Sequence, residues 1–257
     1  MIKCILKRVP FVLPLYRELR KAWASINFIF EFRWFKKISN SRTDFSIEWK
    51  DRYPCLSDKT TNTGFDRHYV FHTAWAARIV AETMPEKHID ISSSLYFCSI
   101  VSAFVNTEFY DYRPANLNLG NLKSRSGDLL KLPFPDNSVA SLSTMHVVEH
   151  IGLGRYGDPV DPMGDIKAIH ELTRVLADDG NLLFVVPVGA PRIMFNAHRI
   201  YSYEQILKYF SDLTLMEFAL IPDDENEGGL IRNASPTLVL TQSYACGCFH
   251  FKKIKSS

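Results

Sequence analysis

The sequence predicts an α/β fold built on a doubly wound, mostly parallel sheet. The run at residues 182–186 is apolar on both faces, which is typical of a central strand covered by helices on both sides. Residues 165–177, just before it, carry apolar side chains at helical spacing. Strand-like and helix-like segments alternate along the rest of the second half, as they do in parallel sheets. The length of 257 residues suits one such domain with an extra element.

The first predicted helix begins at Asp66, a residue that can cap it, and ends at Pro85. Residues 202–205 form a capping box, Ser-Tyr-Glu-Gln, that opens another helix. Gly180 stands where the helix over 165–177 needs a left-handed residue at its end. The expected strands cover 88–91, 108–111, a weaker segment towards Asp128, 139–145, 182–186, 213–220 and 244–251, with a short helix over 95–104.

Charge divides the chain into three predicted parts: a basic, aromatic N-terminal arm over residues 1–45, a linker over 46–65 and a main domain over 66–257. Residues 1–40 contain nine Lys or Arg and two Glu, so they carry +7, whereas the rest of the chain carries −5. An acidic main domain does not favour nucleic-acid binding. The overall composition, with 46% hydrophobic and 23% charged residues, excludes disordered, collagen-like and disulfide-scaffold proteins.

The arm alternates bulky aromatic and basic residues, which suits a helix lying in a membrane interface. Alternatively, it packs on the main domain or forms a dimer contact. No run of 18 uncharged apolar residues is present, and Pro10, Pro14, Arg17 and Arg20 interrupt the apolar stretch. We therefore expect neither a transmembrane helix nor a signal peptide, and a cytoplasmic location with or without peripheral contact to the inner face of the membrane.

The five cysteines are scattered and odd in number, so they form no disulfide framework and fit reduced thiols in a cytoplasm. The sequence Cys246-Gly-Cys248 could be a fragment of a metal site. Because no second cysteine pair exists, we interpret it as buried strand thiols and assign no metal.

Polar residues directly after the first three predicted strands form a candidate cofactor site, because ligands of such sheets bind at the carboxyl ends of the strands. The first strand ends with Asp90-Ile91, and three serines follow in place of a glycine-rich turn, of which Ser92 and Ser94 offer small hydroxyl groups. Asp111 follows 21 positions after Asp90, a spacing at which a carboxylate accepts both ribose hydroxyls. Asp128 can accept an adenine amino group, with Leu129 beside it. The alternative is a degenerate or lost site.

A second group follows the fourth and fifth strands and forms a candidate acceptor site. It comprises His146, Glu149 and His150, then a glycine-containing loop with Arg155 and Asp158, and finally Asn196, His198 and Arg199. A histidine can take the proton that an acceptor loses, and arginine can bind a phosphate or carboxylate. Alternatively, these groups satisfy buried loops, and Arg155 pairs with Asp158, Asp161 or Asp165.

The residues His146–His150 also fit the zinc peptidase pattern H-x-x-E-H. That chemistry needs both histidines on one helical face. Here they follow a β-branched strand and precede Gly152 and Gly154, so no helix of useful length is expected.

The order of these motifs resembles class I S-adenosylmethionine-dependent methyltransferases over residues 66–253. This resemblance implies a Rossmann-like, seven-stranded, doubly wound sheet and S-adenosylmethionine as cofactor. The absence of glycines in the first motif departs from the family pattern. The motifs are Asp90, Asp111, Asp128 with 132–134, 147–150, 171–176 and 180–183.

The chain is similar in more detail to an uncharacterised bacterial family, a domain of unknown function associated with surface-polysaccharide genes, through residues 146–159, 195–201 and 247–249. This second resemblance implies a glycan setting but assigns no reaction. Together with the order of the strand-end residues, it leads us to expect methyl transfer to a surface-glycan precursor or a related phosphorylated or sugar acceptor. Two alternatives stay open: a catalytically silent scaffold in glycan assembly, and a protein that binds a sugar nucleotide without turnover.

Overall fold

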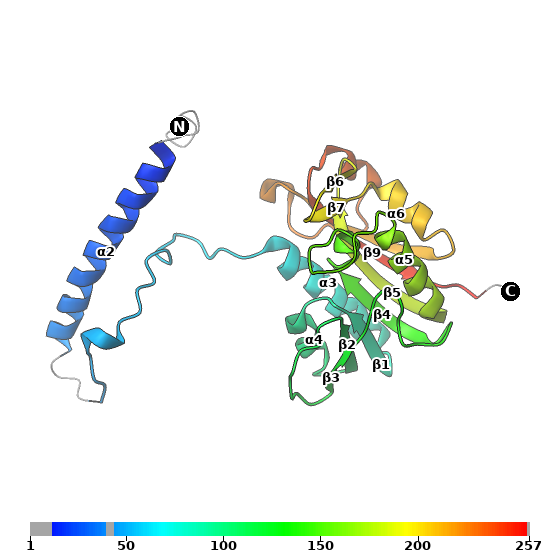
Figure 1. The fold of residues 1–257 in the computed structure, drawn as a ribbon, viewed down its shortest axis with the longest axis horizontal. Coiled ribbons are helices and arrows are strands. Elements are labelled where there is room, and N and C mark those ends of the chain that lie inside the picture. The colour runs from blue at the N-terminus through cyan, green and yellow to red at the C-terminus, as the bar shows by residue number, and fades with distance from the viewer. Residues whose placement is uncertain (1–11, 40–43, 256–257) are drawn as a thin grey trace. The chain divides into compact units, whose positions relative to one another are not determined.

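The computed structural model describes residues 12–39 and 44–255 and divides the chain into two compact units, Met1–Gly64 and Phe65–Ser257 (Figure 1). Residues 1–11 of the predicted arm, with Lys3, Cys4, Lys7 and Arg8, lie outside the described residues. Each unit is described by itself below.

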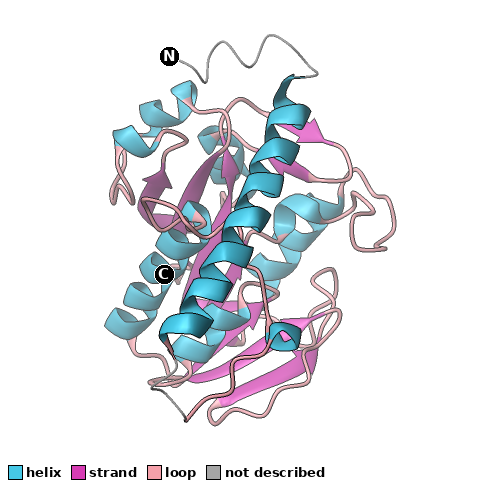
Figure 2. Cartoon of the chain, turned by 90° about the vertical axis from the view of Figure 1, so that its left-hand side faces the viewer, coloured by secondary structure: helices cyan, strands magenta, loops and turns pink. Residues whose placement is uncertain are grey.

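The first unit is built on α2 (Val12–Ile38), one continuous helix of 27 residues (Figure 2). A short 3-10 turn, η2 (Trp49–Asp51), follows it. Trp49 packs on Phe28 and Phe32, with ring centroids 6.4 and 5.0 Å apart. Among the described residues, no helix combines the length and apolar composition needed to cross a membrane. Large apolar side chains nevertheless recur every three or four residues and are exposed: Tyr16, Leu19, Trp23, Ile26, Phe30, Trp34 and Ile38.

The second unit contains a seven-stranded sheet in the order β3-β2-β1-β4-β5-β9-β8. The first five strands of this order run parallel, and β9 is antiparallel to both of its neighbours. The strands are β1 (Lys87–Ile91), β2 (Asn106–Asp111), β3 (Leu122–Ser126), β4 (Val139–Met145), β5 (Leu176–Val188), β8 (Thr214–Ile221) and β9 (Ala245–Lys252). The predicted sheet type is confirmed, and so are the positions of the seven predicted strands. β5 differs most at its ends: it begins at Leu176, six residues before the predicted start, within the segment predicted as the end of the preceding helix.

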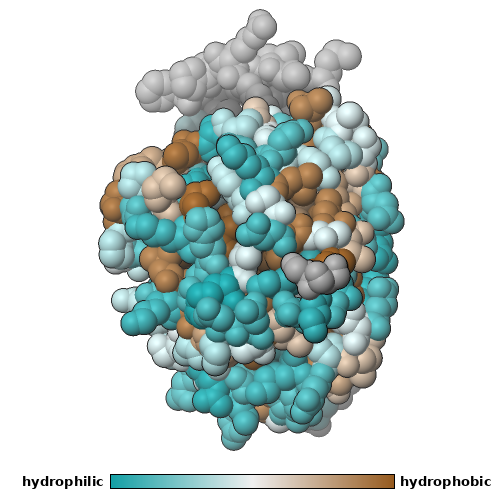
Figure 3. All heavy atoms as spheres, turned by 90° about the vertical axis from the view of Figure 1, so that its right-hand side faces the viewer, coloured by the Kyte–Doolittle hydropathy of each residue, from teal (hydrophilic) through white to brown (hydrophobic). Residues whose placement is uncertain are grey.

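Helices cover both faces of this sheet because the side chains of β5 alternate between two cores. Leu182, Phe184 and Val186 belong to the core under α5 (Gly164–Val175) and α6 (Tyr203–Tyr209). Leu183 and Val185 belong to the core under α3 (Arg67–Thr83) and α4 (Leu95–Val101). A strand that is buried on both faces needs the unbroken apolar run on which the fold prediction rests. On the face of the molecule in Figure 3, apolar residues lie scattered among hydrophilic ones.

Both predicted helix starts are confirmed. The Asp66 carboxylate accepts the Tyr69 amide at 3.1 Å, and Ser202 and Gln205 form the complete capping box. α3 ends at Met84, which adopts the left-handed conformation just before Pro85.

The prediction for Gly180 is wrong. α5 runs directly into β5, and Gly180 lies inside this strand, while Asp179 takes the left-handed conformation (φ 60°). A Cβ on Gly180 would lie 2.7 Å from the Ala177 carbonyl oxygen, so close backbone packing explains the glycine.

Three further features position the loops around the sheet. A hairpin of β6 (Arg192–Met194) and β7 (His198–Ile200), which was not predicted, follows β5. A 3-10 turn, η3 (Val148–His150), follows β4, and two others are η4 (Glu225–Glu227) and η5 (Pro236–Thr241). The motif residue Arg174 donates to the Phe134 carbonyl oxygen (2.9 Å) and to both Glu171 oxygens (2.8 and 2.7 Å), and so fixes the loop before β4.

Candidate functional site

Asp90 lies near the carboxyl end of β1, just before the turn, and is fully buried. Its carboxylate accepts the Ser93 amide at 3.0 Å and also the hydroxyl of Ser143 on β4. Burial raises the pKa of Asp90 to about 6, and these hydrogen bonds act in the opposite direction. Asp90 therefore holds the turn and β4 together from inside the protein.

The serines after Asp90 reproduce a backbone path that glycine favours. Ser92 is left-handed (φ 56°), and both its amide and its hydroxyl donate to the Tyr110 carbonyl oxygen, at 2.8 and 3.1 Å. The Ser93 hydroxyl accepts the Met145 amide at 2.9 Å. Ser94 is half-buried at the start of α4 and makes no capping hydrogen bond with its side chain. Of the two predicted cofactor serines, only Ser94 keeps an uncommitted hydroxyl in the described part of the chain.

Behind this turn lies a continuous buried polar chain, which we call the His88 network: Ser141, His88, Ser143, Asp90 and Ser93. The two ring nitrogens of His88 lie 2.8 and 2.9 Å from the hydroxyls of Ser141 and Ser143. Burial lowers the pKa of His88 to about 3, so the ring is neutral at pH 7. Each nitrogen has a partner, as buried polar groups require.

Asp111 and Asp128 lie together at the carboxyl edge of β2 and β3. The Gly127 amide donates to the Asp111 carbonyl oxygen at 3.0 Å, and this bond brings the two turns side by side. Asp111 Oδ1 accepts the Arg113 amide (2.7 Å), and Asp128 Oδ1 accepts the Leu130 amide (2.9 Å). The second oxygen of each carboxylate has no hydrogen bond within the described residues. Leu129 is buried in the core beneath them.

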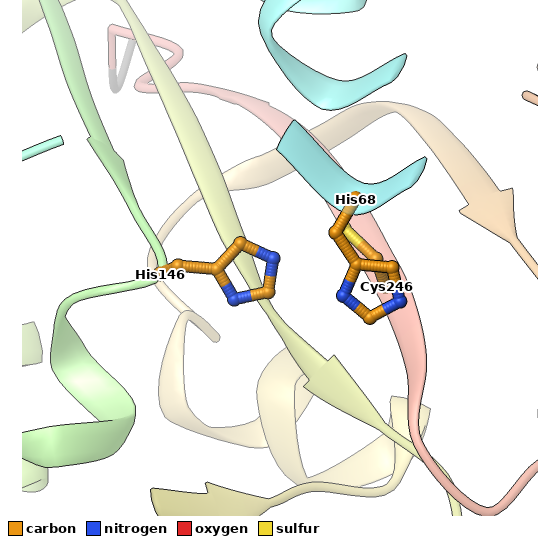
Figure 4. Close-up of side chains that lie close together, drawn as sticks. All are labelled: His68, His146 and Cys246. Atoms are coloured by element: carbon orange, nitrogen blue, oxygen red, sulfur yellow. The ribbon is translucent and has the colours of Figure 1, made fainter. Parts of the chain in front are cut away.

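His146 directly follows β4 in a left-handed conformation (φ 57°), which turns the chain into η3. Its Nδ1 lies 2.8 Å from Glu149 Oε1. The ring stacks on His68 with centroids 5.4 Å apart and meets the edge of His72 at 5.1 Å. In Figure 4 the rings of His68 and His146 lie next to each other, with the side chain of Cys246 beside His68.

In this histidine cluster (His68, His72 and His146, beside Cys246), His68 is half-buried and the others are buried, and several of the polar atoms lack hydrogen-bond partners. His146 Nε2, Glu149 Oε2 and both nitrogens of His72 lack a hydrogen-bond partner. One ligand atom each of His68, His146 and Cys246 lies within 4.8 Å of the other two. Burial, with the nearby His146, lowers the pKa of His68 to about 4, and burial raises the pKa of the Cys246 thiol.

Sequence reasoning missed His68 and His72. A signal was present: they stand four residues apart, directly after the helix cap Asp66, and residues at this spacing share one face of a helix. Cys246 was weighed only with Cys248, whose sulfur lies 3.9 Å away on the same strand.

The structure brings His150, Arg155 and His198 together beside the β6–β7 hairpin. His150 Nδ1 and Arg155 Nη1 both donate to the Ala197 carbonyl oxygen, at 2.6 and 3.2 Å. The rings of His150 and His198 lie 6.4 Å apart, and burial lowers the pKa of His198. The guanidinium groups of Arg155 and Arg113 both lie over the Tyr156 ring, at 5.0 and 5.2 Å.

Arg155 makes no ion pair with a carboxylate in the described part of the chain, so the alternative pairing with Asp158, Asp161 or Asp165 is wrong. Asp158 accepts the Gly152 and Tyr156 amides instead (2.7 and 3.2 Å), and Asp161 pairs with Lys167 at 2.6 Å. Asn196 Nδ2 donates weakly to the Leu153 carbonyl oxygen at 3.4 Å.

Arg199 does not join the predicted acceptor group, which corrects the expectation that it faces the crevice. Its side chain is buried, pairs with Asp165 at 3.4 Å and donates to the Ile151 carbonyl oxygen at 2.6 Å. The partner Asp165 also accepts the Tyr201 hydroxyl at 3.0 Å. Arg199 therefore ties the hairpin to the loop after β4.

Two surface hollows lie away from these residues. One of about 520 Å³ includes Asn137, Arg174, Tyr209 and Lys253, at the amino end of β4, and one of about 410 Å³ runs along β3 from Leu117 to Arg125. Neither contains a predicted site residue. We place the candidate site by the strand ends instead, because ligands of doubly wound sheets bind there.

Sequence comparisons with known proteins match only part of the chain. A family model described as "Caenorhabditis protein of unknown function, DUF268" matches residues 136–220, which include His146 through Arg199. That description names Caenorhabditis, not the bacterial group expected from the sequence. No curated protein matches the chain in sequence.

Solved structures decide the fold class. The N-methyltransferase NodS from Bradyrhizobium japonicum, in complex with S-adenosylhomocysteine, has a TM-score of 0.51 at 13% identity, over 79% of this chain and 92% of NodS. The 1,6-didemethyltoxoflavin-N1-methyltransferase of Burkholderia thailandensis has a TM-score of 0.51 at 9% identity, over 72% of this chain and 79% of that one. This chain has the class I methyltransferase fold. At such identities the likeness concerns the fold alone.

Proposed function

We propose that the protein is an S-adenosylmethionine-dependent methyltransferase whose cofactor site lies at the carboxyl ends of β1, β2 and β3. The observation that carries the proposal is the methyltransferase strand order together with Asp111 and Asp128, each with one uncommitted oxygen at that edge. The similar proteins NodS and the Burkholderia enzyme were solved with S-adenosylhomocysteine bound, which supports this choice of cofactor.

The residues fit this cofactor in part. Asp111 is half-buried at the end of the second strand, where a carboxylate accepts both ribose hydroxyls. Asp128 is exposed beside it and can accept an amino group. The bound cofactor would supply an electrophilic methyl group, so the protein has to align an acceptor and remove the proton that the acceptor loses.

His150 is the best-placed proton acceptor. Its Nδ1 donates to the Ala197 carbonyl oxygen, which fixes the tautomer and leaves the lone pair on Nε2. Its side chain is 13% exposed, whereas that of His146 is only 5% exposed. His150 can therefore reach an acceptor at the surface more readily than His146.

Arg155 and Arg113 favour an anionic acceptor. Both are exposed beside Tyr156 and have no carboxylate partner within the described residues. Guanidinium groups match phosphate and carboxylate oxygens. We infer a phosphorylated sugar, a sugar nucleotide or an anionic glycan end, consistent with the surface-glycan precursor that the sequence resemblance implies.

Calorimetry with S-adenosylmethionine and S-adenosylhomocysteine tests the cofactor assignment. We expect binding to the native chain and about tenfold weaker binding to Asp111→Asn, because one charge-assisted hydrogen bond is lost. The control is Asp178→Asn, an exposed carboxylate at the opposite end of the sheet, for which affinity should not change. Absence of binding at millimolar concentration of either compound would overturn the proposal.

A catalytically silent scaffold or a sugar-nucleotide-binding protein is the second candidate. The committed hydroxyls of Ser92 and Ser93, in a turn without glycine, favour it. If the chain binds neither cofactor form but binds a nucleoside diphosphate sugar, and Arg155→Ala removes that binding, this second candidate replaces the first.

We also propose that the first unit contacts an anionic membrane surface. The exposed apolar residues of α2 recur at helical spacing between basic residues, which suits an interfacial helix. We expect the protein to sediment with anionic vesicles, less so as salt rises. The double variant Trp23→Gln, Phe30→Gln should lose this binding while it keeps every charge. Unchanged sedimentation of that variant would contradict the membrane role.

A further inference from the structure

The histidine cluster contains a set of metal-ligand atoms drawn from three separate elements. His68 lies in the first turn of α3, His146 directly after β4, and Cys246 in β9 (Figure 4). One donor atom from each lies within 4.8 Å of the other two. Bound to zinc at about 2.0 Å for nitrogen and about 2.3 Å for sulfur, tetrahedral donors lie about 3.3–3.6 Å apart. Small side-chain rotations would therefore close the set around an ion.

The hydrogen bonding of His146 has the form found in metal sites. Its Nδ1 donates to Glu149 Oε1 at 2.8 Å, and its Nε2 is buried without a partner. Metal-ligating histidines usually donate the other ring N–H to a carboxylate, which fixes the ring and leaves the lone pair on the nitrogen that binds the ion. His88 shows the fully bonded alternative, because both of its ring nitrogens lie within hydrogen-bond distance of a serine hydroxyl.

The acidic groups around the cluster, Glu149 and Cys246, also favour a bound cation. The Glu149 side chain is 1% exposed, and its Oε2 has no hydrogen-bond partner. Cys246, which lies near His146, is fully buried and would bind a metal as the thiolate. A divalent ion balances one thiolate and one carboxylate, so the bound site is neutral as a whole. The proton of the thiol leaves to solvent when the ion binds.

We propose that His68, His146 and Cys246 bind one zinc ion, with Glu149 as the partner that orients His146. Two imidazole nitrogens and one thiolate are a donor set that zinc prefers, and three protein ligands leave the fourth position open for water or another oxygen. His72 packs against the ring of His146 and shapes the wall of this site. The zinc site does not depend on the proposed methyl transfer.

The test measures zinc content and zinc affinity of the full chain by competition with a chromophoric chelator. We expect one zinc ion per chain. Glu149→Gln keeps an acceptor for His146 but removes the charge, and should weaken zinc binding by about 10–100-fold. His68→Gln, His146→Gln and Cys246→Ala should each weaken it by more than that. The matched controls are Cys248→Ala on the same strand and His250→Gln, both of which should keep native affinity.

Cobalt provides a readout that a purely structural role would not change. Thiolate-bound cobalt shows a sulfur-to-metal charge-transfer band, which we expect in the native chain and in Cys248→Ala but not in Cys246→Ala. His68 is half-buried in the first turn of α3, so His68→Gln stays informative if His146→Gln fails to fold. A native chain without zinc or cobalt affinity overturns the proposal, and so does unchanged affinity in both His68→Gln and Cys246→Ala.

S-adenosylhomocysteine binding, measured on the same samples, separates this inference from the proposed function. Zinc binding without cofactor binding leaves the zinc site standing and removes the methyltransferase proposal. Cofactor binding without zinc binding does the reverse.

Discussion

The His88 network and the histidine cluster are two largely buried polar groups beside the same strand, β4, and they differ in how completely they are bonded. In the network, each ring nitrogen of His88 faces a serine hydroxyl, and the Ser143 hydroxyl also donates a hydrogen bond to the Asp90 carboxylate. In the cluster, His146 Nε2, Glu149 Oε2 and both nitrogens of His72 have no partner. Complete bonding is typical of a structural role, whereas the unpartnered Nε2 of His146 is the atom that the proposed zinc ion would take.

The largest expected effect comes from breaking the network. His88→Leu leaves the hydroxyls of Ser141 and Ser143 buried without the ring, and should lower the free energy of unfolding by about 3 kcal/mol. Urea unfolding measures the change. His88→Gln, which retains a donor and an acceptor, should recover much of the loss. Equal losses in the two variants would show that hydrogen bonding is not what stabilises the network.

Acidification should lower the free energy of unfolding through the His88 network, because His88 stays neutral in the folded protein. Burial lowers its pKa to about 3, while the unfolded side chain titrates near about 6.5. Between these values the unfolded state binds the extra proton, so stability falls as the pH drops through 6.5 and stops falling below about 3.

From pH 7 to pH 5, the native chain should therefore lose about 2 kcal/mol more than His88→Gln. Asp90 acts in the opposite direction in both proteins: its pKa is raised to about 6, so the folded state takes up a proton as the pH falls. Urea unfolding at both pH values gives the difference. Parallel pH profiles for the two proteins would contradict a neutral buried His88.

The smallest effect is expected in the cluster. His72 is fully buried with two unbonded nitrogens, so His72→Leu removes no hydrogen bond and should change the stability of the zinc-free protein by less than about 1 kcal/mol. Thermal unfolding in the presence of a chelator measures it. If His72→Leu lowered the free energy of unfolding as much as His88→Leu, the two regions would not differ in how much their histidines stabilise the fold.

The fold could be predicted from the sequence because its signals are local. The apolar run of β5, the capping box at Ser202 and the cap at Asp66 each report the structure of their own segment. The role of Gly180 was predicted wrongly because it is not a local signal of a helix end. It depends on the close approach of the Ala177 carbonyl oxygen and on how α5 meets β5, which residue spacing does not reveal.

For the candidate site, the sequence predicted where several residues lie but not what their side chains bind. The strand-end rule placed Asp111, Asp128 and His146 at one edge of the sheet, but it could not tell that the Ser92 hydroxyl and the Arg199 guanidinium are used internally. Cys246 and His146 are about a hundred residues apart, and His68 precedes the sheet altogether. Contacts of this kind arise from the sheet order, in which β9 lies beside β5 and near the end of β4.

The position of β9 also sets an order of assembly. β9 is the strand with the highest residue numbers in the described sheet, yet it lies between β5 and β8 in the interior of that sheet. During synthesis, β5 is therefore an open edge and β8 has no strand to pair with until residues 245–252 have left the ribosome. Cys246 is delivered by this same strand, so the proposed zinc ligands can meet only when the sheet is complete.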